Sequence, residues 1–193
     1  MLAVNFALHP MASKERGWKH SWEKSFLEGS RSGFFRNTFA DMERIIGELA
    51  ERFGTLFEFE SYDLGHLYKL GHLLDRGLVK SKPFVQFVIG IPGRIGADAD
   101  NLSFLKQPAT RLFGDYIECS ALPAGRRQMP HCTMAANPRG NARVWFEDSP
   151  CLARRLLTES NPKQVEKITR TVSELQIGAA TPSEARRRLQ IAQ

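Results

Sequence analysis

The stretch of sequence that decides the fold is Pro83-Phe84-Val85-Gln86-Phe87-Val88-Ile89-Gly90. This apolar run is almost unbroken, which is typical of a strand whose two faces are both covered, as in parallel sheets. A loop rich in glycine and proline follows over 90–96, and a helix is expected over 100–111. A strand followed by a loop and a helix is the unit from which parallel sheets with crossover helices are built.

The same succession of elements continues on both sides of this strand. Further strands are expected over 2–8, 56–61, 116–122 and 143–148, with helices near 38–49, 62–76, 134–135, 160 and 181. Two of the helix starts have capping boxes, Thr38 with Asp41 and Thr181 with Glu184. The pattern therefore predicts an α/β fold with about five parallel strands and flanking helices.

The number of strands suggests part of a barrel. A closed (β/α)8 barrel needs eight strands and about 250 residues, whereas this chain has 193 residues. We therefore expect a single partial domain over 1–193, the C-terminal part of a TIM barrel, with an irregular insertion over 9–36 and helices over 160–193. A small doubly wound sheet is the alternative, but no Gly-x-Gly-x-x-Gly loop follows the first strand.

Composition narrows the class of protein. Apolar residues make up 42% of the chain and charged residues 25%, which is typical of a globular protein. The net charge of +6 would suit an anionic partner, but no zinc-finger spacing or RNA-binding aromatic motif accompanies it, so nucleic acid is not expected. The three cysteines are widely spaced, which argues against a disulfide framework. No membrane span or signal peptide is evident, so a cytoplasmic location is expected.

The expected strand over 143–148 combines one cation with two adjacent carboxylates. It begins at Arg143 and ends at Glu147 and Asp148. Alternate residues of a strand share a face, so Arg143, Trp145 and Glu147 are expected to point the same way. Charged groups are costly to bury unless they are paired or bound to a metal. A strand-end salt bridge without chemistry and a functional site both fit this pattern.

Short motifs carry a family resemblance along nearly the whole chain. They are Asn37-Thr38-Phe39, Tyr62-Asp63-Leu64-Gly65-His66-Leu67-Tyr68, Leu74-Asp75-Arg76-Gly77-Leu78, Gly125-Arg126 with Gln128, Arg143-Val144 with Glu147-Asp148, Ser160-Asn161 and Ala180-Thr181-Pro182-Ser183-Glu184-Ala185-Arg186. In this order they resemble the β-keto acid cleavage enzymes, whose named prototype is the 3-keto-5-aminohexanoate cleavage enzyme. The resemblance implies a zinc-dependent (β/α)8 barrel. It also implies condensation of a β-keto acid with acetyl-CoA, followed by release of acetoacetate and a new acyl-CoA.

The resemblance also implies roles for single residues. Glu147 resembles the carboxylate ligand of the zinc ion, and Asp148 resembles the base that removes a proton α to the ketone. Arg143 resembles the partner that holds this base, lowering its pKa and keeping it ionised. Glu60 resembles a carboxylate of the substrate pocket, with a buried glutamate paired to a basic neighbour as the alternative. Arg126 and Arg127, just past the strand over 116–122, are candidate contacts for CoA phosphates, with a pair of solvated loop arginines as the alternative.

Three departures from the family pattern bear on activity. The family supplies two zinc ligands from a His-x-His strand, and this chain has five histidines but no such spacing. Ala3 stands where the family usually has Ser or Thr, and Trp145-Phe146 replaces a smaller pair. These departures predict an N-terminally truncated family member. It would bind zinc weakly, turn over little β-keto acid and self-associate as a homo-oligomer through an unpaired sheet edge.

Two other classes of function stay open at this point. The first is a non-catalytic remnant or subunit that binds a partner or a CoA-like anion. The second is a sugar-phosphate barrel enzyme that uses its late loops for phosphate, although no glycine-rich phosphate cradle favours it.

Two of the five histidines of this chain, His66 and His72, lie six residues apart and are poorly placed to share one helical face. A packing or capping role is therefore expected for both.

Overall fold

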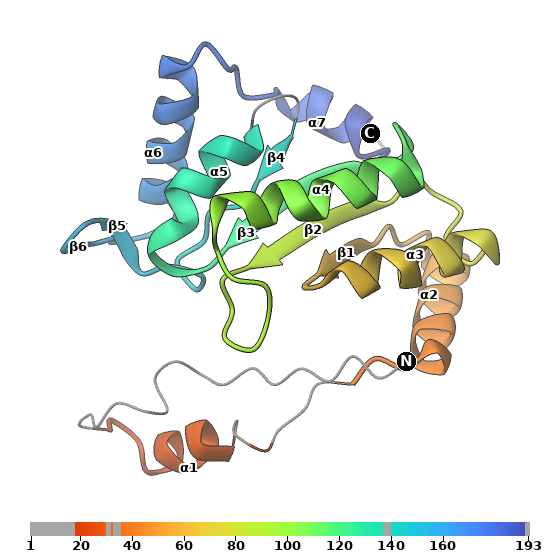
Figure 1. Cartoon of the computed structure of the whole chain (residues 1–193), viewed down its shortest axis with the longest axis horizontal. Coiled ribbons are helices and arrows are strands. Elements are labelled where there is room, and N and C mark those ends of the chain that lie inside the picture. The colour runs from red at the N-terminus through yellow and green to blue at the C-terminus, as the bar shows by residue number, and fades with distance from the viewer. Residues whose placement is uncertain (1–17, 30–31, 33–35, 137–139, 192–193) are drawn as a thin grey trace.

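The fold contains a parallel sheet with helices packed on it (Figure 1). The computed structural model describes residues 18–29, 32, 36–136 and 140–191. Four strands pair in the order β1-β2-β3-β4, and every pair is parallel. The strands are β1 (Glu58–Ser61), β2 (Phe84–Ile89), β3 (Glu118–Pro123) and β4 (Asn141–Ala142). The predicted α/β class is confirmed, whereas the strand expected over 2–8 lies outside the described residues and a closed barrel is not seen in them.

Most of the helices begin close to the predicted positions, although the first was not predicted and the fifth begins before the expected 134–135. They are α1 (Ser21–Gly29), α2 (Phe39–Phe53), α3 (Leu64–Asp75), α4 (Ala99–Phe113), α5 (Gln128–Ala136), α6 (Asn161–Glu174) and α7 (Pro182–Arg188), with a 3-10 turn η1 (Gly125–Arg127). Both predicted capping boxes are present, at Thr38 with Asp41 and at Thr181 with Glu184. Helix α1 lies within the insertion expected to be irregular, and α6 and α7 are the expected C-terminal helices.

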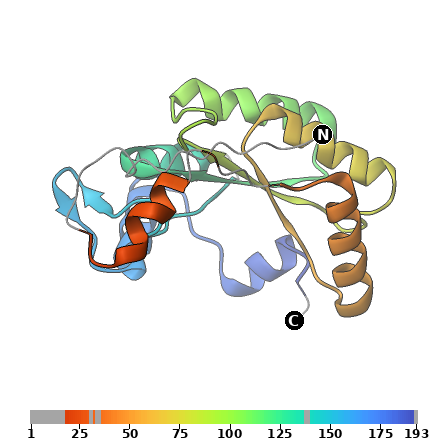
Figure 2. The same cartoon turned by 90° about the horizontal axis from the view of Figure 1, so that it is seen from below.

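One face of the sheet forms the hydrophobic core. Viewed from below, α3 and α4 lie on one side of the sheet and α7 on the other (Figure 2). The core side chains come from the odd-numbered positions of the strands and from the facing helices. They include Val85, Phe87, Ile89, Leu67, Leu73, Leu105 and Ala121, all at most 2% exposed. The long apolar run in β2 is therefore explained by its central place between β1 and β3.

The opposite face of the same strands has a row of polar residues beside the buried apolar Val88 and Leu122. The strand register aligns Glu60 with Gln86, Gln86 with Ser120, and Ser120 with Asn141. Because alternate residues point to opposite faces, this row lies on the side of the sheet away from the core. Gln86 and Ser120 are nevertheless buried, at 1% and 4% exposed. A row of polar groups at this position is a feature of a binding site rather than of a packed core.

The prediction of a strand over 143–148 was wrong in its extent. The β4 ladder stops at Ala142, although Arg143 N still donates to Ala121 O at 3.0 Å. Phe146, Glu147 and Asp148 form a turn, which is closed by a 3.1 Å hydrogen bond from Ser149 N to Trp145 O. Since the chain turns here, the strand alternation expected for Arg143, Trp145 and Glu147 does not extend to Glu147.

A short hairpin follows this turn and was not predicted. Strands β5 (Cys151–Ala153) and β6 (Leu156–Leu157) pair antiparallel, and Arg155 between them has a positive φ of 63°. Leu157 is 68% exposed, so the hairpin lacks the apolar alternation that would have marked it as two strands. Among the described helices, none is both long and apolar enough to cross a membrane.

Candidate active site

The site lies where the parallel strands end. Carboxyl ends of neighbouring parallel strands meet at one edge, which brings together the loops after β1, β2, β3 and β4. The loop after β4 is tied to the loop after β3, because Gly125 N donates to Asp148 O at 2.8 Å. Gly125 adopts a φ of +70°, which is unfavourable for residues with a Cβ. This bond holds Asp148 at the end of the sheet.

Arg143 is the centre of the site. Its Nε lies 3.7 Å from Asp148 Oδ2 and its Nη1 lies 3.9 Å from Glu60 Oε1. Nη1 also donates to Gln86 Oε1 at 3.2 Å, and the guanidinium lies 5.6 Å from the Trp145 ring centroid. The structure therefore brings three of the predicted residues together, since Glu60 lies on β1 whereas Arg143 and Asp148 follow β4, and these two strands are not neighbours in the sheet.

The pKa of Asp148 is shifted in the direction opposite to the prediction. Burial raises its pKa to about 6, and the nearby carboxylates of Glu147 and Glu60 act in the same direction. Arg143 lowers the pKa but does not outweigh the desolvation. The predicted ion pair is therefore present, whereas the predicted net lowering of the pKa is wrong. A carboxyl group poised near neutral pH is well suited to accept a proton.

Removing Arg143 should raise the pKa of Asp148 further. In Arg143→Met the attractive charge is lost while the burial of Asp148 remains, so the carboxylate is less favoured. The pKa can be followed by NMR titration of the labelled carboxyl carbon. Arg154→Met, at an exposed residue beyond the site, serves as the control and should leave the titration unchanged. A fall in the pKa of Asp148 in Arg143→Met would contradict this account of the pair.

Glu60 is held by a tyrosine that the sequence did not single out for this role. Tyr62 Oη donates to Glu60 Oε2 at 2.6 Å. Burial, followed by the hydrogen bond to Glu60, raises the pKa of Tyr62, which keeps the phenol protonated as the donor. Gln86 was also missed, although it donates to Glu58 and accepts from Arg143. A polar residue inside the otherwise apolar run 83–90 was the available signal.

Glu147 and the implied zinc ion do not form a complete site in the described residues. Glu147 is exposed on the turn before Asp148. Within the described part of the chain there is no group of three or more His, Cys, Asp or Glu side chains placed to hold a metal ion. A catalytic zinc normally has about three protein ligands. The described residues thus do not fit this cofactor by themselves, and we derive no chemical step through it.

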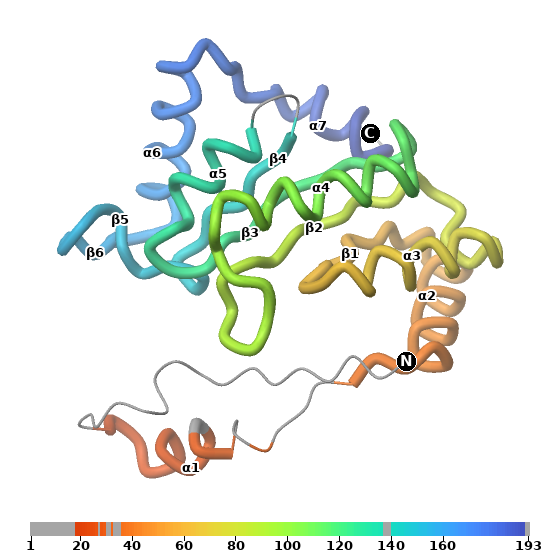
Figure 3. Tube along the Cα trace, in the orientation of Figure 1, coloured from red at the N-terminus to blue at the C-terminus, as the bar shows by residue number. Residues whose placement is uncertain are grey.

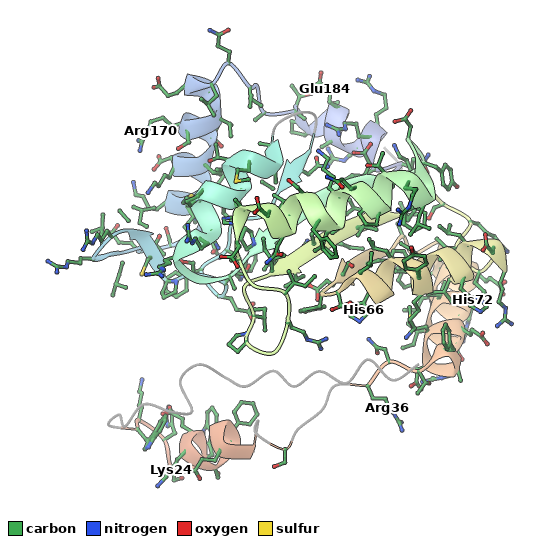
Figure 4. All side chains as sticks on the ribbon, viewed as in Figure 1. Lys24, Arg36, His66, His72, Arg170 and Glu184 are labelled. Atoms are coloured by element: carbon green, nitrogen blue, oxygen red, sulfur yellow. The ribbon has the colours of Figure 1, made fainter. Side chains whose placement is uncertain are left out.

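The histidines of α3 have structural contacts. His66 Nδ1 accepts a hydrogen bond from Tyr62 N at 3.1 Å, and burial lowers its pKa, which favours the neutral ring. His72 packs edge-on against Phe39, with ring centroids 5.3 Å apart. The two lie at different ends of α3 (Figure 4). The expected capping and packing roles agree with these contacts.

The fold and site define an α/β protein with a carboxylate–arginine centre at the carboxyl ends of its strands. The family model of the beta-keto acid cleavage enzymes matches residues 1–191, and the chain belongs to this family.

Individual relatives fit the same assignment. The chain is 44% identical over 191 residues to the 3,5-dioxohexanoate:acetyl-CoA acetone transferase of Paraburkholderia graminis, covering 99% of this chain and 61% of that protein. It is 34% identical over 131 residues to the 3-keto-5-aminohexanoate cleavage enzyme of Acetoanaerobium sticklandii, covering 67% of this chain and 46% of that protein. It is 30% identical over 138 residues to the 3-dehydrocarnitine:acetyl-CoA trimethylamine transferase of Rhizobium meliloti, covering 69% and 43%. The chain thus spans about three-fifths or less of the length of these curated relatives.

Proposed function

We propose that this chain provides the proton-transferring part of a β-keto acid cleavage site. In the proposed reaction a β-keto acid is condensed with acetyl-CoA, and the adduct is split into acetoacetate and a new acyl-CoA. The observation that supports it best is the contact of 3.7 Å between Arg143 Nε and Asp148 Oδ2, with Asp148 at a pKa of about 6. The names of the relatives support acetyl-CoA as the co-substrate.

Asp148 is the base in this proposal. Its carboxylate takes the proton α to the ketone, and Arg143 remains beside it to stabilise the ionised form before transfer. Glu60 lies on the other side of Arg143, and together with Tyr62 it lines a pocket that would receive the substrate. Because only the ionised carboxylate accepts a proton, activity should rise with pH through about 6, the pKa of Asp148.

Release of acetoacetate from acetyl-CoA tests the proposal. A panel of 3,5-dioxohexanoate, 3-keto-5-aminohexanoate and 3-dehydrocarnitine follows from the names of the relatives, and 3,5-dioxohexanoate is our first choice. The assay contains excess zinc, because the described residues predict weak retention of the ion. Turnover is expected to be slow and to depend on Asp148. Turnover that is unchanged in Asp148→Asn would contradict the assignment of the base.

Zinc content is expected to be low. Glu147 is the one predicted zinc ligand, and the described residues supply no group of three ligands around it. We expect the purified chain to hold well below one zinc ion per chain by atomic emission, with no further loss in Glu147→Gln. Stoichiometric zinc that disappears in Glu147→Gln would instead show that other residues complete the site.

Arg126 is the proposed contact for CoA phosphate. It is exposed on η1, next to Gly125, whose N–H bonds to Asp148 O. Arg126→Ala should weaken CoA binding by about 2- to 5-fold, and the loss should be larger at low salt because exposed charges are screened by ions. Calorimetric titration of CoA at two salt concentrations measures this effect, with Arg155→Ala as the control. Equal affinities would reject the assignment.

A non-catalytic function is the second candidate. It is favoured by the exposed position of Glu147 and by the missing ligand cluster in the described residues. In that case the chain binds a CoA-like anion or a partner subunit without turnover. Absence of acetoacetate in the presence of excess zinc, together with retained CoA binding, would identify it. Self-association into a homo-oligomer and a cytoplasmic location belong to both proposals.

A further inference from the structure

The loop between β2 and α4 brings a second arginine to the site. This loop leaves the carboxyl end of β2 and projects from the sheet (Figure 3). It is closed on itself, because Gly90 N donates to Ile95 O at 2.8 Å and Arg94 N donates to Ile91 O at 3.0 Å. A Cβ added at Gly90 would lie 2.9 Å from Ala97 Cβ, and the φ of Gly90 is +84°. The loop is therefore a compact turn with a defined place for Arg94.

Arg94 connects to the site through Tyr62. The guanidinium carbon lies 5.2 Å from the centroid of the Tyr62 ring, which is within the range of a cation–π contact. The hydroxyl of the same ring donates to Glu60, and Glu60 lies 3.9 Å from Arg143. One continuous series of contacts thus joins Arg94, Tyr62, Glu60 and Arg143 across the loops after β1, β2 and β4.

Two hydrogen-bond donors of the Arg94 guanidinium are unsatisfied among the described residues. Its Nε and Nη2 are both buried and have no hydrogen-bond partner among the described residues. In a guanidinium these two nitrogens lie on one edge and direct parallel N–H bonds, the arrangement that binds carboxylate and phosphate with two hydrogen bonds. Buried donors without a partner are unfavourable, so a ligand oxygen at this edge would be well bound.

The nearest acidic neighbour does not occupy this edge. Asp63 acts on Arg94 through space, but no Arg94–Asp63 ion pair within 4.0 Å occurs among the described residues. Asp63 is engaged at the start of α3, where its Oδ1 accepts from Gly65 N at 3.2 Å. Burial lowers the pKa of Arg94, while Tyr62 and Asp63 act in the opposite direction.

We propose that Arg94 is a further substrate-binding residue, whose Nε–Nη2 edge binds an anionic oxygen pair of an incoming substrate. The inference rests on the proposed function, because it places this anion beside the Glu60–Arg143–Asp148 site. Two parts of the substrates offer the required chemistry, the carboxylate of the β-keto acid and a phosphate of CoA. The flat guanidinium edge can donate two hydrogen bonds to either group, so binding measurements must distinguish the carboxylate from the phosphate.

Two matched pairs of ligands make that distinction. Acetoacetate is compared with its methyl ester, which lacks the carboxylate charge, and CoA is compared with pantetheine, which lacks the phosphates. Calorimetric titrations use the wild-type chain, Arg94→Met and Arg94→Lys. Arg170→Met, on the exposed side of α6 and away from the site, is the control (Figure 4).

Arg94→Met should weaken binding of one charged ligand by about 10- to 100-fold. This is the loss expected when a charged contact made of two parallel hydrogen bonds is removed. The uncharged member of that pair should bind equally to both proteins. Arg94→Lys should recover only part of the affinity, because lysine restores the charge without the planar edge. Loss for acetoacetate assigns the carboxylate, and loss for CoA assigns the phosphate.

Three results would overturn the inference. They are unchanged affinities for both charged ligands, an equal loss for the charged and uncharged members of a pair, and no binding of either charged ligand by the wild-type chain. Turnover assays run alongside separate this inference from the proposed function. Selective loss of binding in Arg94→Met without wild-type turnover would retain the anion site and reject the catalytic proposal.

Discussion

Asp148→Asn is expected to stabilise the folded protein above pH 6 while lowering turnover by about 10²- to 10⁴-fold. Burial raises the pKa of Asp148 from 3.8 to about 6, so the folded state binds this proton more tightly than the unfolded state does. The stability that the protonated carboxyl contributes is complete below about pH 4 and is lost as the pH rises through about 6. Above that pH the buried charge costs up to about 3 kcal/mol, and asparagine removes this cost.

Urea unfolding between pH 4 and pH 8 measures the effect. The variant and the wild-type protein should have similar free energies of unfolding near pH 4, and the variant should become the more stable one towards pH 8. Asp115→Asn, at an exposed residue, is the control and should change little at any pH. A variant that is less stable than wild type at pH 8 would show that the Arg143 contact outweighs desolvation.

Phe87→Ala is expected to have the largest effect on stability. Phe87 lies in the central strand β2, is 2% exposed and belongs to the core that joins the sheet to its helices. Truncating a buried phenylalanine costs about 3 to 5 kcal/mol through lost burial and the cavity left behind. Domains of this kind are stable by about 5 to 15 kcal/mol in total, so much of the stability would be lost.

Phe53→Ala is the matched control for this prediction. Phe53 is the last residue of α2 and is 69% exposed, so the same truncation should change the free energy of unfolding by no more than about 0.5 kcal/mol. Chemical denaturation of both variants and the wild type gives the comparison. Similar losses in the two variants would mean that the central packing of β2 is not what holds the domain together.

The carboxylate of Asp148 shows how function and stability oppose each other at this site. Charged groups that are half removed from water destabilise the fold, yet the same burial brings the pKa into the range where proton transfer is efficient. Glu58 is also affected, since burial raises its pKa as well. The polar face of the sheet is thus kept at an energetic cost, which is expected for a site rather than for a core.

Much of the fold could be predicted from local patterns. The period of apolar residues located β2, β3 and α2, and the capping boxes at Thr38 and Thr181 located two helix starts. The extent of β4 could not be predicted, because the run 143–148 has strand-like residues but is bent by a turn that depends on Ser149 and on the loop at Gly125. Strand propensity is decided as much by pairing partners as by the residues themselves.

The candidate site was predicted only in part, because some of its contacts depend on how the strands pair. Arg143 and Asp148 are close in sequence, so their pairing could be expected from spacing, whereas Tyr62 and Gln86 join them only through the register of β1 and β2 with the rest of the sheet. Glu147, by contrast, was expected on the strand face with Arg143 and lies exposed on the turn. Its proposed role as a metal ligand requires further ligands, because the described residues contain no group of three or more side chains placed to hold a metal ion.

The sequence by itself determined the class of fold, the alternation of strands and helices in the parallel sheet, the family and the identity of the charged residues that follow the fourth strand. These follow from periodicity, capping and motif order, which are local features of the sequence and can be recognised without knowledge of tertiary contacts. Tertiary structure alone decided the direction of the Asp148 pKa shift, the hydrogen bond between Tyr62 and Glu60 and the position of Arg94 over Tyr62. Desolvation and pairing depend on which distant groups exclude water from a side chain, and sequence spacing does not contain that information.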